Sequence, residues 1–410
     1  MNNLAEQLLF EDKGGKNLHL EHIEDEILNY GITGGRASIN FVRSLRDMFA
    51  GASRSSINMT VKWDGAPAIF AGVDPADGKF FVGKKSVFNV EPQLYKTNAD
   101  VDKYTSGDLN AKLKVALSEF SKLGIKGVLQ GDLMFTDDVS TDTIDGKKYY
   151  TFQPNTIVYA VDVDSDFGSQ IKKAKIGVVW HTTYTGKDFA SMKASYGVDV
   201  SKFKKTKNVW SQDAMLTNVG EATLTAKETE EVNKHLTNCG KLFNKISGST
   251  LRELEGNQML AQHIEQYNNT LVREGQLLPP SASHVNGLIK WIDKKYKGEM
   301  DKRKTDKGKK TQQDKLDIIM KFFSTTNKKS LINMFDLQKS IVLAKLKLIN
   351  KLNSIGKTST FVKTKKGYKV AGAEGFVAID KLGNDAVKLV DRMEFSYNNF
   401  SSDVLKGWDK

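Results

Sequence analysis

Hydrophobic residues near the start of the chain recur every three or four positions, the spacing that predicts one buried face of a helix. The pattern predicts an N-terminal helical segment over residues 1–52, with helices at 19–28 and 37–49. The glycine-rich stretch 31–35 is expected to separate these helices as a turn and cap.

Residues 53–200 change to short runs of β-branched and aromatic residues with turn residues between them, which is typical of strands. Strands are predicted at 57–61, 68–72, 80–83, 127–135, 149–151, 156–163 and 176–182, and one helix at 109–123. This succession predicts an α+β fold with mainly antiparallel sheet.

Helical spacing dominates again between residues 201 and 356. Helices are predicted at 229–243, 249–267, 283–296, 314–323 and 329–352, and strands resume at 360–362, 368–370, 375–380 and 386–390. We therefore expect a helical insertion, 201–356, between a first part (53–200) and a last part (357–410) of one α+β domain. Its lysine-rich stretch, 294–315, predicts a solvated loop or helix end.

Composition narrows the class of protein. The chain has 410 residues, a net charge of +12 and one cysteine, Cys239, which excludes an intramolecular disulfide and a multi-cysteine zinc site. No apolar run approaches the ~20 residues that span a bilayer, and the N-terminus lacks the pattern of a secretory signal. We expect a cytoplasmic protein that does not enter a membrane. The excess of Lys and Arg indicates a nucleic-acid partner, or serves solubility alone.

The most informative motif is Lys62-Trp63-Asp64-Gly65, between two predicted strands. It resembles the Lys-x-Asp-Gly nucleophile motif of the ATP-dependent polynucleotide ligases and mRNA capping enzymes. The resemblance implies that Lys62 attacks the α-phosphate of a nucleoside triphosphate, so that a covalent lysine–nucleotide forms and pyrophosphate leaves. The alternative is a tight β-hairpin, because Asp-Gly is a common turn dipeptide between paired strands. The two interpretations are compatible.

Later segments resemble further motifs of the same superfamily in the same order. The run 81–86 lies where motif Ia is expected and contains Lys84 and Lys85. The run 129–135 is similar to motif III, with Asp132 where glutamate is usual, and 157–162 is similar to motif IIIa, with Tyr159 as its aromatic residue. The resemblance implies that Asp132 binds the ribose and Tyr159 the base.

Two motifs lie near the end of the chain. Residues 373–378 resemble motif IV, whose glutamate would be Glu374, and 385–390 resemble motif V, whose first lysine would be Lys388. Val390 stands where motif V has a second lysine, which Lys381 or Arg392 would have to replace.

The resemblance implies a mainly antiparallel nucleotidyltransferase domain of the ATP-grasp-like ligase type. The catalytic residues it implies are Lys62, Asp64 and Lys388. The nucleotide-binding residues it implies are Lys62, Gly65, Lys84, Lys85, Asp132, Tyr159, Glu374 and Lys388. ATP would be bound with Mg²⁺ or Mn²⁺, and Glu374 and Asp132 would hold the metal.

The phage RNA ligases are the nearest relatives by this resemblance, because 391–410 is too short for the OB-fold usual in DNA ligases and capping enzymes. RNA is therefore the expected partner, and host cytoplasm the expected location if the protein is phage-encoded. Two alternatives stay open. One is a non-catalytic nucleic-acid-binding or virion-associated phage protein on a ligase-like fold, and the other is a GTP-using or protein-modifying transferase. The sequence does not indicate an oligomeric state.

Three histidines are further candidates for a metal-binding or phosphate-binding role. His19 and His22 lie three positions apart among acidic residues and could bind a metal, although a solvated helix face is the more common reason for that pattern. His181 ends a buried-looking strand and could assist at the phosphates, although a structural role is more common there.

Overall fold

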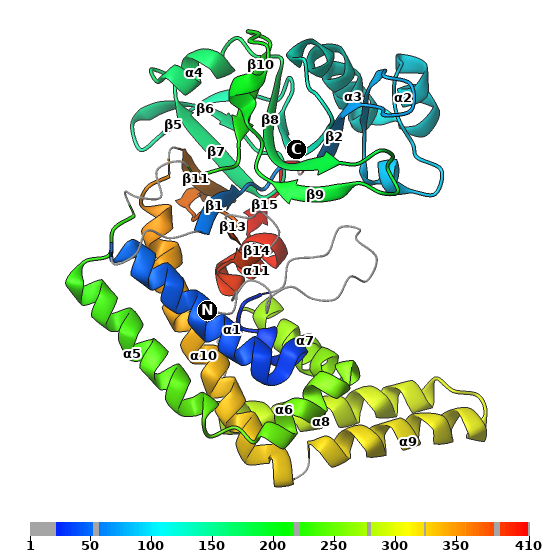
Figure 1. Cartoon of the computed structure of the whole chain (residues 1–410), viewed down its shortest axis with the longest axis vertical. Helices are drawn as coiled ribbons and strands as arrows, with labels where there is room; N and C mark the ends of the chain where they lie inside the picture. Colours follow the sequence, from blue (N-terminus) through cyan, green and yellow to red (C-terminus); the bar gives the residue numbers. More distant parts are fainter. Residues whose placement is uncertain are drawn as a thin grey trace.

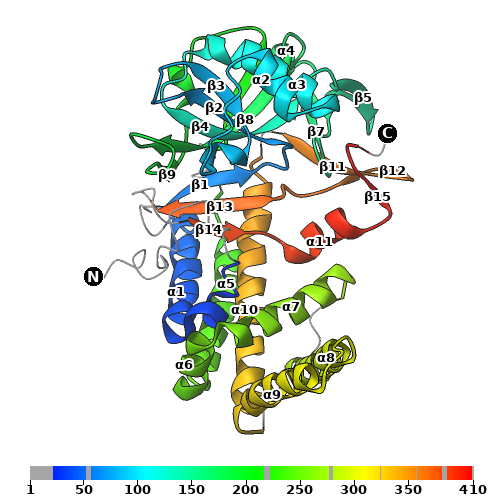
Figure 2. The same cartoon turned by 90° about the vertical axis from the view of Figure 1, so that its right-hand side faces the viewer.

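The computed structural model describes residues 22–51, 57–216, 222–276, 280–323, 325–356, 358–380 and 386–408. A β-rich part and a helical body lie one above the other, and a three-stranded sheet lies between them (Figures 1 and 2). No described helix combines the length and apolar character needed to cross a membrane.

The first sheet, here called the β8 sheet, has the strand order β10-β8-β4-β2-β3, with β9 also on β8. Its strands are β2 (Ala68–Val73), β3 (Phe80–Gly83), β4 (Val128–Phe135), β8 (Ile176–Thr185), β9 (Lys193–Tyr196) and β10 (Val209–Asp213). All its pairs are antiparallel except β10 with β8.

The second sheet, here called the β7 sheet, has the order β12-β11-β7-β6-β5, with β15 on β11. Its strands are β5 (Ser140–Ile144), β6 (Lys147–Phe152), β7 (Ile157–Asp162), β11 (Ser359–Thr364), β12 (Gly367–Val370) and β15 (Val404–Leu405). The β7 and β8 sheets share an aromatic core that includes Phe135, Phe152, Tyr159 and Trp210.

The third sheet, here called the β1 sheet, joins distant parts of the chain. It pairs β1 (Ile57–Lys62) with β13 (Gly375–Asp380), and β13 with β14 (Ala386–Leu389), all antiparallel. Successive side chains alternate between the faces of a strand. Met59 and its neighbours in the sheet, Ala378 and Val387, therefore share one face, and all three belong to the core of the helical body.

Short helices complete the β-rich part. They are η2 (Lys85–Phe88), α2 (Asn98–Tyr104), α3 (Gly107–Phe120), η3 (Ser121–Leu123), α4 (Asp166–Ile171) and η4 (Val200–Lys202). Helix α3 places Leu113, Ala116 and Phe120 at helical spacing against the β8 sheet, in a core with Trp180. The β8 sheet is thus covered on one face by α3 and on the other by the β7 sheet.

The helical body is built from distant parts of the chain. Its helices are α1 (Glu26–Phe49), α5 (Ala226–Phe243), α6 (Gly248–Gly256), α7 (Gln258–Arg273), α8 (Ser281–Asp301), α9 (Asp306–Phe322) and α10 (Thr325–Asn353). Helix α10 runs beside α5 and α1 up to the β1 sheet, and α11 (Arg392–Phe400) lies against α7 (Figure 2). Helices α8 and α9 form a projecting pair, the α8–α9 hairpin (Figure 1).

A buried ion network ties this body together. The Lys345 ammonium lies 2.7 Å from the Glu24 carboxylate, with side chains 1% and 3% exposed. Arg392 at the start of α11 reaches Asp25 at 2.8 Å, and the Gln338 amide donates to Asp25 at 3.1 Å. Residues 24–26 are therefore buried, and the expected solvated helix face is wrong for them.

The α+β class with mainly antiparallel sheet is confirmed, and each predicted strand has a counterpart in the structure. Other expectations need correction. The glycine stretch 31–35 does not separate two helices, because α1 is only kinked at Tyr30 and Gly31 and then continues. The predicted helix 249–267 is two helices, α6 and α7, which meet at Asn257. By contrast, the lysine-rich stretch 294–315 is, as expected, made of solvated helix ends: it contains the end of α8 and the start of α9, with a short exposed connection between them.

Candidate active site

Lys62 stands at the end of β1 and faces a glutamate from the far end of the chain. Its register partner on β13 is Gly375, so Glu374 lies one residue before that pair. The Lys62 Nζ is 2.5 Å from the Glu374 Oε1, and the lysine side chain is 34% exposed while the glutamate side chain is 9% exposed. A partly accessible lysine is thereby paired with a nearly buried carboxylate.

The segment after Lys62 is not a β-hairpin turn. Strands β1 and β2 belong to different sheets, because β1 pairs with β13 and β2 pairs with β3 and β4. The turn instead docks on β4, where the Ala66 amide donates to the Leu133 carbonyl at 3.0 Å. A Cβ atom at Gly65 would come within 2.4 Å of the Asp132 Cβ, so only glycine allows this close approach.

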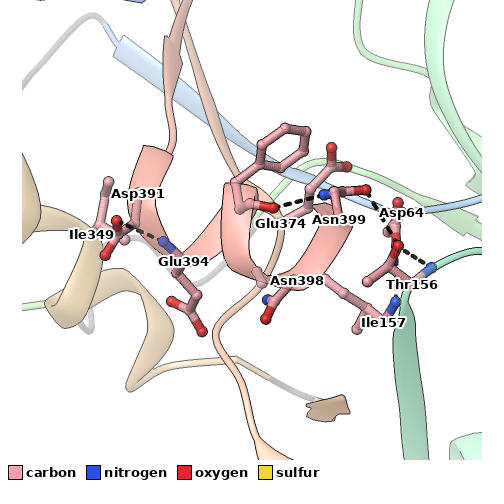
Figure 3. Close-up of a pocket in the computed structure, with 11 residues that line it drawn as sticks. Asp64, Thr156, Ile157, Ile349, Glu374, Asp391, Glu394, Asn398 and Asn399 are labelled. Atoms are coloured by element: carbon pink, nitrogen blue, oxygen red, sulfur yellow. Dashed lines mark hydrogen bonds between the residues drawn. The ribbon is translucent and has the colours of Figure 1, made fainter. Parts of the chain in front are cut away.

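Asp64 holds the turn to the start of β7. Its Oδ2 accepts hydrogen bonds from the amides of Thr156 (2.7 Å) and Ile157 (2.8 Å) (Figure 3). Its Oδ1 accepts one from the Asn155 side chain (2.7 Å). Burial raises the pKa of the Asp64 carboxyl, and these three donors oppose that rise. With both oxygens engaged, Asp64 is placed to orient the motif rather than to bind a metal.

Tyr159 also supports the motif from behind. Its hydroxyl accepts a hydrogen bond from the Asp64 amide at 2.6 Å. The ring is 2% exposed, stacks against Phe152 with centroids 5.6 Å apart, and lies 4.8 Å from the Trp63 ring. A base-stacking role would need a free ring face, and in this structure neighbouring aromatic rings contact Tyr159. Burial raises its pKa well above the ordinary value, so the hydroxyl stays protonated.

Asp132 on β4 forms the other wall of the site. Burial raises its pKa to about 7, against the attraction of Lys62, with Glu374 and Asp64 adding to the rise. His181 Nε2 lies 3.8 Å from the Asp132 Oδ2. Burial, together with the nearby Lys62 charge, lowers the pKa of His181 to about 4, so this imidazole is neutral near pH 7.

Lys388 joins the site from β14. It pairs with Val377, which pairs with Thr60, so Lys388 and Lys62 share one face of the β1 sheet. Its charge also lowers the pKa of Glu374, although burial leaves that pKa raised overall. The predicted phosphate-binding lysine is therefore close to the Lys62–Glu374 pair.

Motif V has a second lysine where this chain has Val390, and Arg392, the described residue expected to replace that lysine, does not do so. Val390 is buried, and a Cβ at Gly375 would come within 2.5 Å of its Cγ2. Arg392 is engaged by Asp25 and by Asn269 at 2.7 Å, in the helical body. Lys381 and His19 lie outside the described residues.

Lys84 and Lys85 follow β3 at the same end of the β8 sheet as Asp132. Gly83 at the end of β3 pairs with Phe70, two residues after Ala68, and Ala68 pairs with Asp132. Lys84 is half-buried and Lys85 is exposed. Neither makes an ion pair with the other site residues in the described part of the chain.

The carboxylates are suited to a metal held jointly with a ligand. Over the described ranges, no three histidines, cysteines or carboxylates gather as a ready metal site. Asp132 and Glu374 are both close enough to Lys62 to be affected by its charge, and Mg²⁺ is commonly held by one or two carboxylates plus substrate phosphates and water. The donor set thus fits Mg²⁺ that arrives with a triphosphate.

Residues 17–404 match the profile of a family described as a family of unknown function, DUF6267. The chain belongs to this family. Searches of curated proteins and of solved structures find no match. For this DUF6267 member, the chemistry must therefore be argued from the site itself.

Two members of this DUF6267 site were not assigned to it from the sequence. For His181 a structural role was preferred to assistance at the phosphates, yet its Nε2 lies 3.8 Å from Asp132 and the Lys62 charge acts on it. Asn155 carried no motif, yet its side chain binds Asp64. A polar residue inside or directly before a run of buried strand residues was the available signal for both.

Proposed function

We propose that the protein is an ATP-dependent, Mg²⁺-requiring nucleotidyltransferase of the polynucleotide ligase type, with Lys62 as its nucleophile. The observation that carries the proposal is the position of Lys62, 2.5 Å from Glu374 and beside Asp132 and Lys388. These residues come from β1, β4, β14 and the start of β13, so distant segments supply one compact set of charged groups.

In the proposed first step, the neutral amine of Lys62 attacks the α-phosphorus of ATP. The Nζ–phosphorus bond forms, the bond to the bridging oxygen breaks, pyrophosphate leaves with the electron pair, and the Nζ releases one proton to solvent as the phosphoramidate forms. The amine must first lose a proton, and Glu374 at 2.5 Å is the carboxylate placed to accept it. Burial raises the pKa of Glu374, which favours its protonated form after the transfer.

The remaining residues have supporting roles in the proposal. Asp64 fixes the turn after Lys62, and Lys388 with Lys84 or Lys85 holds phosphate oxygens. Asp132, joined by Glu374 once that carboxyl has released the Lys62 proton, would hold Mg²⁺, which would neutralise triphosphate charge and ease the departure of pyrophosphate. The neutral His181 supports Asp132 without adding a charge.

In the proposed second step, a nucleic-acid 5′-phosphate oxygen attacks the phosphorus of the lysyl-AMP, and the Nζ–phosphorus bond breaks. A 3′-hydroxyl then attacks the activated 5′-phosphate and AMP leaves. RNA is the proposed strand. The α8–α9 hairpin supports a polyanionic partner, because Lys304, Lys307, Lys309 and Lys310 are exposed and make no ion pair among the described residues.

The proposal is tested by incubating purified protein with α-labelled ATP or GTP and Mg²⁺, followed by a denaturing gel. We expect a labelled band with ATP that added pyrophosphate reverses. Lys62→Ala should abolish the band, and Lys122→Ala, which changes an exposed lysine paired with Glu119 away from the site, should keep it. Labelling that survives in Lys62→Ala would refute the assignment, and a band with GTP alone would change the nucleotide.

A second candidate function is a non-catalytic nucleic-acid-binding protein on the same fold. The buried Val390 favours it, because an apolar side chain fills the place of the second motif V lysine beside Gly375. Salt-sensitive binding of RNA by folded protein that forms no nucleotide adduct would support this candidate.

A further inference from the structure

A cavity lies behind the Lys62 motif, at the junction of the β-rich part and the helical body. Its volume is about 720 Å³, within the range of small-molecule sites. Segments from the end of β1, the end of β10, the start of β11 and the end of α10 line it. Figure 2 shows the upper end of α10 reaching the strands of this junction.

The cavity opens on the opposite face of β1 from Lys62. Val61 and Trp63 line it, whereas Lys62 between them does not. On β13 the same alternation holds, since Phe376, the partner of Val61, lines the cavity and Gly375, the partner of Lys62, does not. A molecule in this cavity is therefore separate from a nucleotide that reacts with Lys62.

One wall of the cavity is built from packed aromatic residues, of which Trp63 and Phe167 are half-buried while Tyr159 and Trp210 are buried. The Trp63 ring lies 4.8 Å from Tyr159 and 6.2 Å from Trp210, and Phe167 lies 6.1 Å from Trp210. Such a wall favours a flat, apolar ring system, because stacked or edge-on aromatic contacts stabilise it beyond simple burial.

The rest of the described lining mixes apolar and polar residues. None of the described lining residues is lysine or arginine, in a chain with net charge +12, and two are carboxylates, Asp213 and Glu394. A phosphate would be repelled here. Gln212 and Asn350 add amide groups whose side chains have no hydrogen-bond partner among the described residues, so they can donate to and accept from the edge of a ring.

We propose that this cavity is a binding site for an uncharged planar heteroaromatic group, a nucleobase, distinct from the site of the reacting nucleotide. The half-buried rings of Trp63 and Phe167 would take the ring face, the amides its polar edge, and the carboxylates would exclude phosphates from the interior. The base can belong to a free nucleoside or to a nucleotide of a bound strand whose phosphates stay outside the cavity.

The test uses the full chain and its own tryptophans, two of which line the cavity. Adenosine, guanosine, cytidine and uridine are titrated separately while tryptophan fluorescence is recorded, with ATP as the phosphorylated comparison. At least one nucleoside should give a saturable change, and its 5′-triphosphate should bind about tenfold more weakly or worse at this site. Lys62→Ala protein should respond as wild type does, which keeps the test independent of nucleotidyl transfer.

Gly356 offers a way to block the cavity without disturbing its walls. It lines the cavity at an exposed position, and an added Cβ would meet only carbonyl oxygens at 3.5 and 3.7 Å, ordinary contact distances. Gly356→Phe should remove the saturable change and leave lysyl adduct formation intact. Gly298→Phe on α8, where a Cβ meets nothing within 4 Å, is the matched control and should behave as wild type.

A second variant, Gln212→Leu, keeps the side-chain size and removes the amide. It should weaken nucleoside binding by about three- to tenfold, the loss of one hydrogen bond. No saturable change with any nucleoside in folded wild type, or equal binding by Gly356→Phe and wild type, would overturn the proposal. Competition by a single-stranded RNA decamer would assign the base to a strand, and its absence would assign it to a free nucleoside.

Discussion

Two lysine–glutamate pairs of nearly equal length stand in different regions of the molecule. The Lys62–Glu374 pair spans 2.5 Å at the edge of the β1 sheet, and the Lys345–Glu24 pair spans 2.7 Å inside the helical body. Lys62 is 34% exposed, whereas Lys345 is 1% exposed. The distance is the same within a few tenths of an ångström, so the surroundings must set what each pair does.

The carboxylates show the difference. Burial alone would raise the pKa of Glu24, but Lys345, His22 and Arg392 together lower it to about 2. At the other pair, Lys62 and Lys388 face three carboxylates, Asp64, Asp132 and Glu374, and burial raises the pKa of Asp132 to about 7. Several cations surround Glu24, so its carboxylate stays charged. The Lys62 site has more carboxylates than lysines among these residues, so it can take up a proton or a cation.

The sharpest test of the comparison is Lys345→Met. Removing the ammonium leaves the buried Glu24 carboxylate with only part of its partners, and such a loss costs about 3–5 kcal/mol of unfolding free energy. Urea denaturation measures it. The double variant Glu24→Leu/Lys345→Met should recover most of the loss, because both buried charges are then gone. If Lys345→Met lowers the unfolding free energy by less than about 1 kcal/mol, the buried pair stabilises the fold no more than an exposed pair would.

The second test is Asp132→Asn across pH. A carboxyl whose pKa is about 7 when folded and 3.8 as its ordinary value favours the folded state below pH 4 and loses that contribution as pH rises to 7. The asparagine variant should therefore match wild type near pH 4 and exceed it at pH 8, by at most about 4 kcal/mol. Unfolding free energies at both pH values measure this. If the unfolding free energies of wild type and Asp132→Asn change equally with pH, this prediction is wrong.

For Glu24 we expect the opposite dependence of unfolding free energy on pH. Because its pKa is lowered when folded, its contribution is present above its ordinary pKa and is lost as pH falls toward 2. Glu24→Gln should therefore be the less stable protein at pH 6, and the gap between it and wild type should narrow below pH 4. Thermal unfolding followed from pH 6 to pH 2 measures the gap, and a constant gap would argue against this assignment.

Lys62→Met is the matched partner of Lys345→Met and should affect stability little. Its ammonium is partly solvated and its removal relieves no large packing, so a change within about 1 kcal/mol is expected. The same urea denaturation measures it. A cost comparable to that of Lys345→Met would mean that Lys62 is a structural lysine, whatever the outcome of adduct labelling.

The smallest effect on stability is expected at the α8–α9 hairpin. Changing Lys304, Lys307, Lys309 and Lys310 to Ala should alter unfolding free energy by about 0.5 kcal/mol or less, because all four side chains are exposed. RNA binding should weaken, and the slope of log affinity against log salt should fall. Lys202→Ala/Lys205→Ala, also exposed, is a control. An unchanged slope would place the RNA elsewhere.

The sequence predicted most of the strands, because alternation and turn residues are local properties of the chain, but it did not predict β5, β9, β10 or β15. It could not predict that β1 pairs with β13 rather than β2, since Asp64-Gly65 is equally compatible with a hairpin. It also could not predict that Tyr159 would bind the Asp64 amide, or that Glu24 and Lys345 would meet, because each depends on contacts between distant segments. The role of Lys62 as nucleophile stays a prediction.

The pairing of β1 with β13 also determines at what point during synthesis of the chain the site can form. Lys62 and its register partner Gly375 are separated by roughly 300 residues, so Glu374 leaves the ribosome about 15 to 60 s after Lys62 at ordinary elongation rates. During that interval the strand that carries the lysine has an unpaired edge, which is a hazard for aggregation. The α1 helix before it and the helices after it must form around this gap. Synthesis of the C-terminal strands is therefore the step that assembles the site.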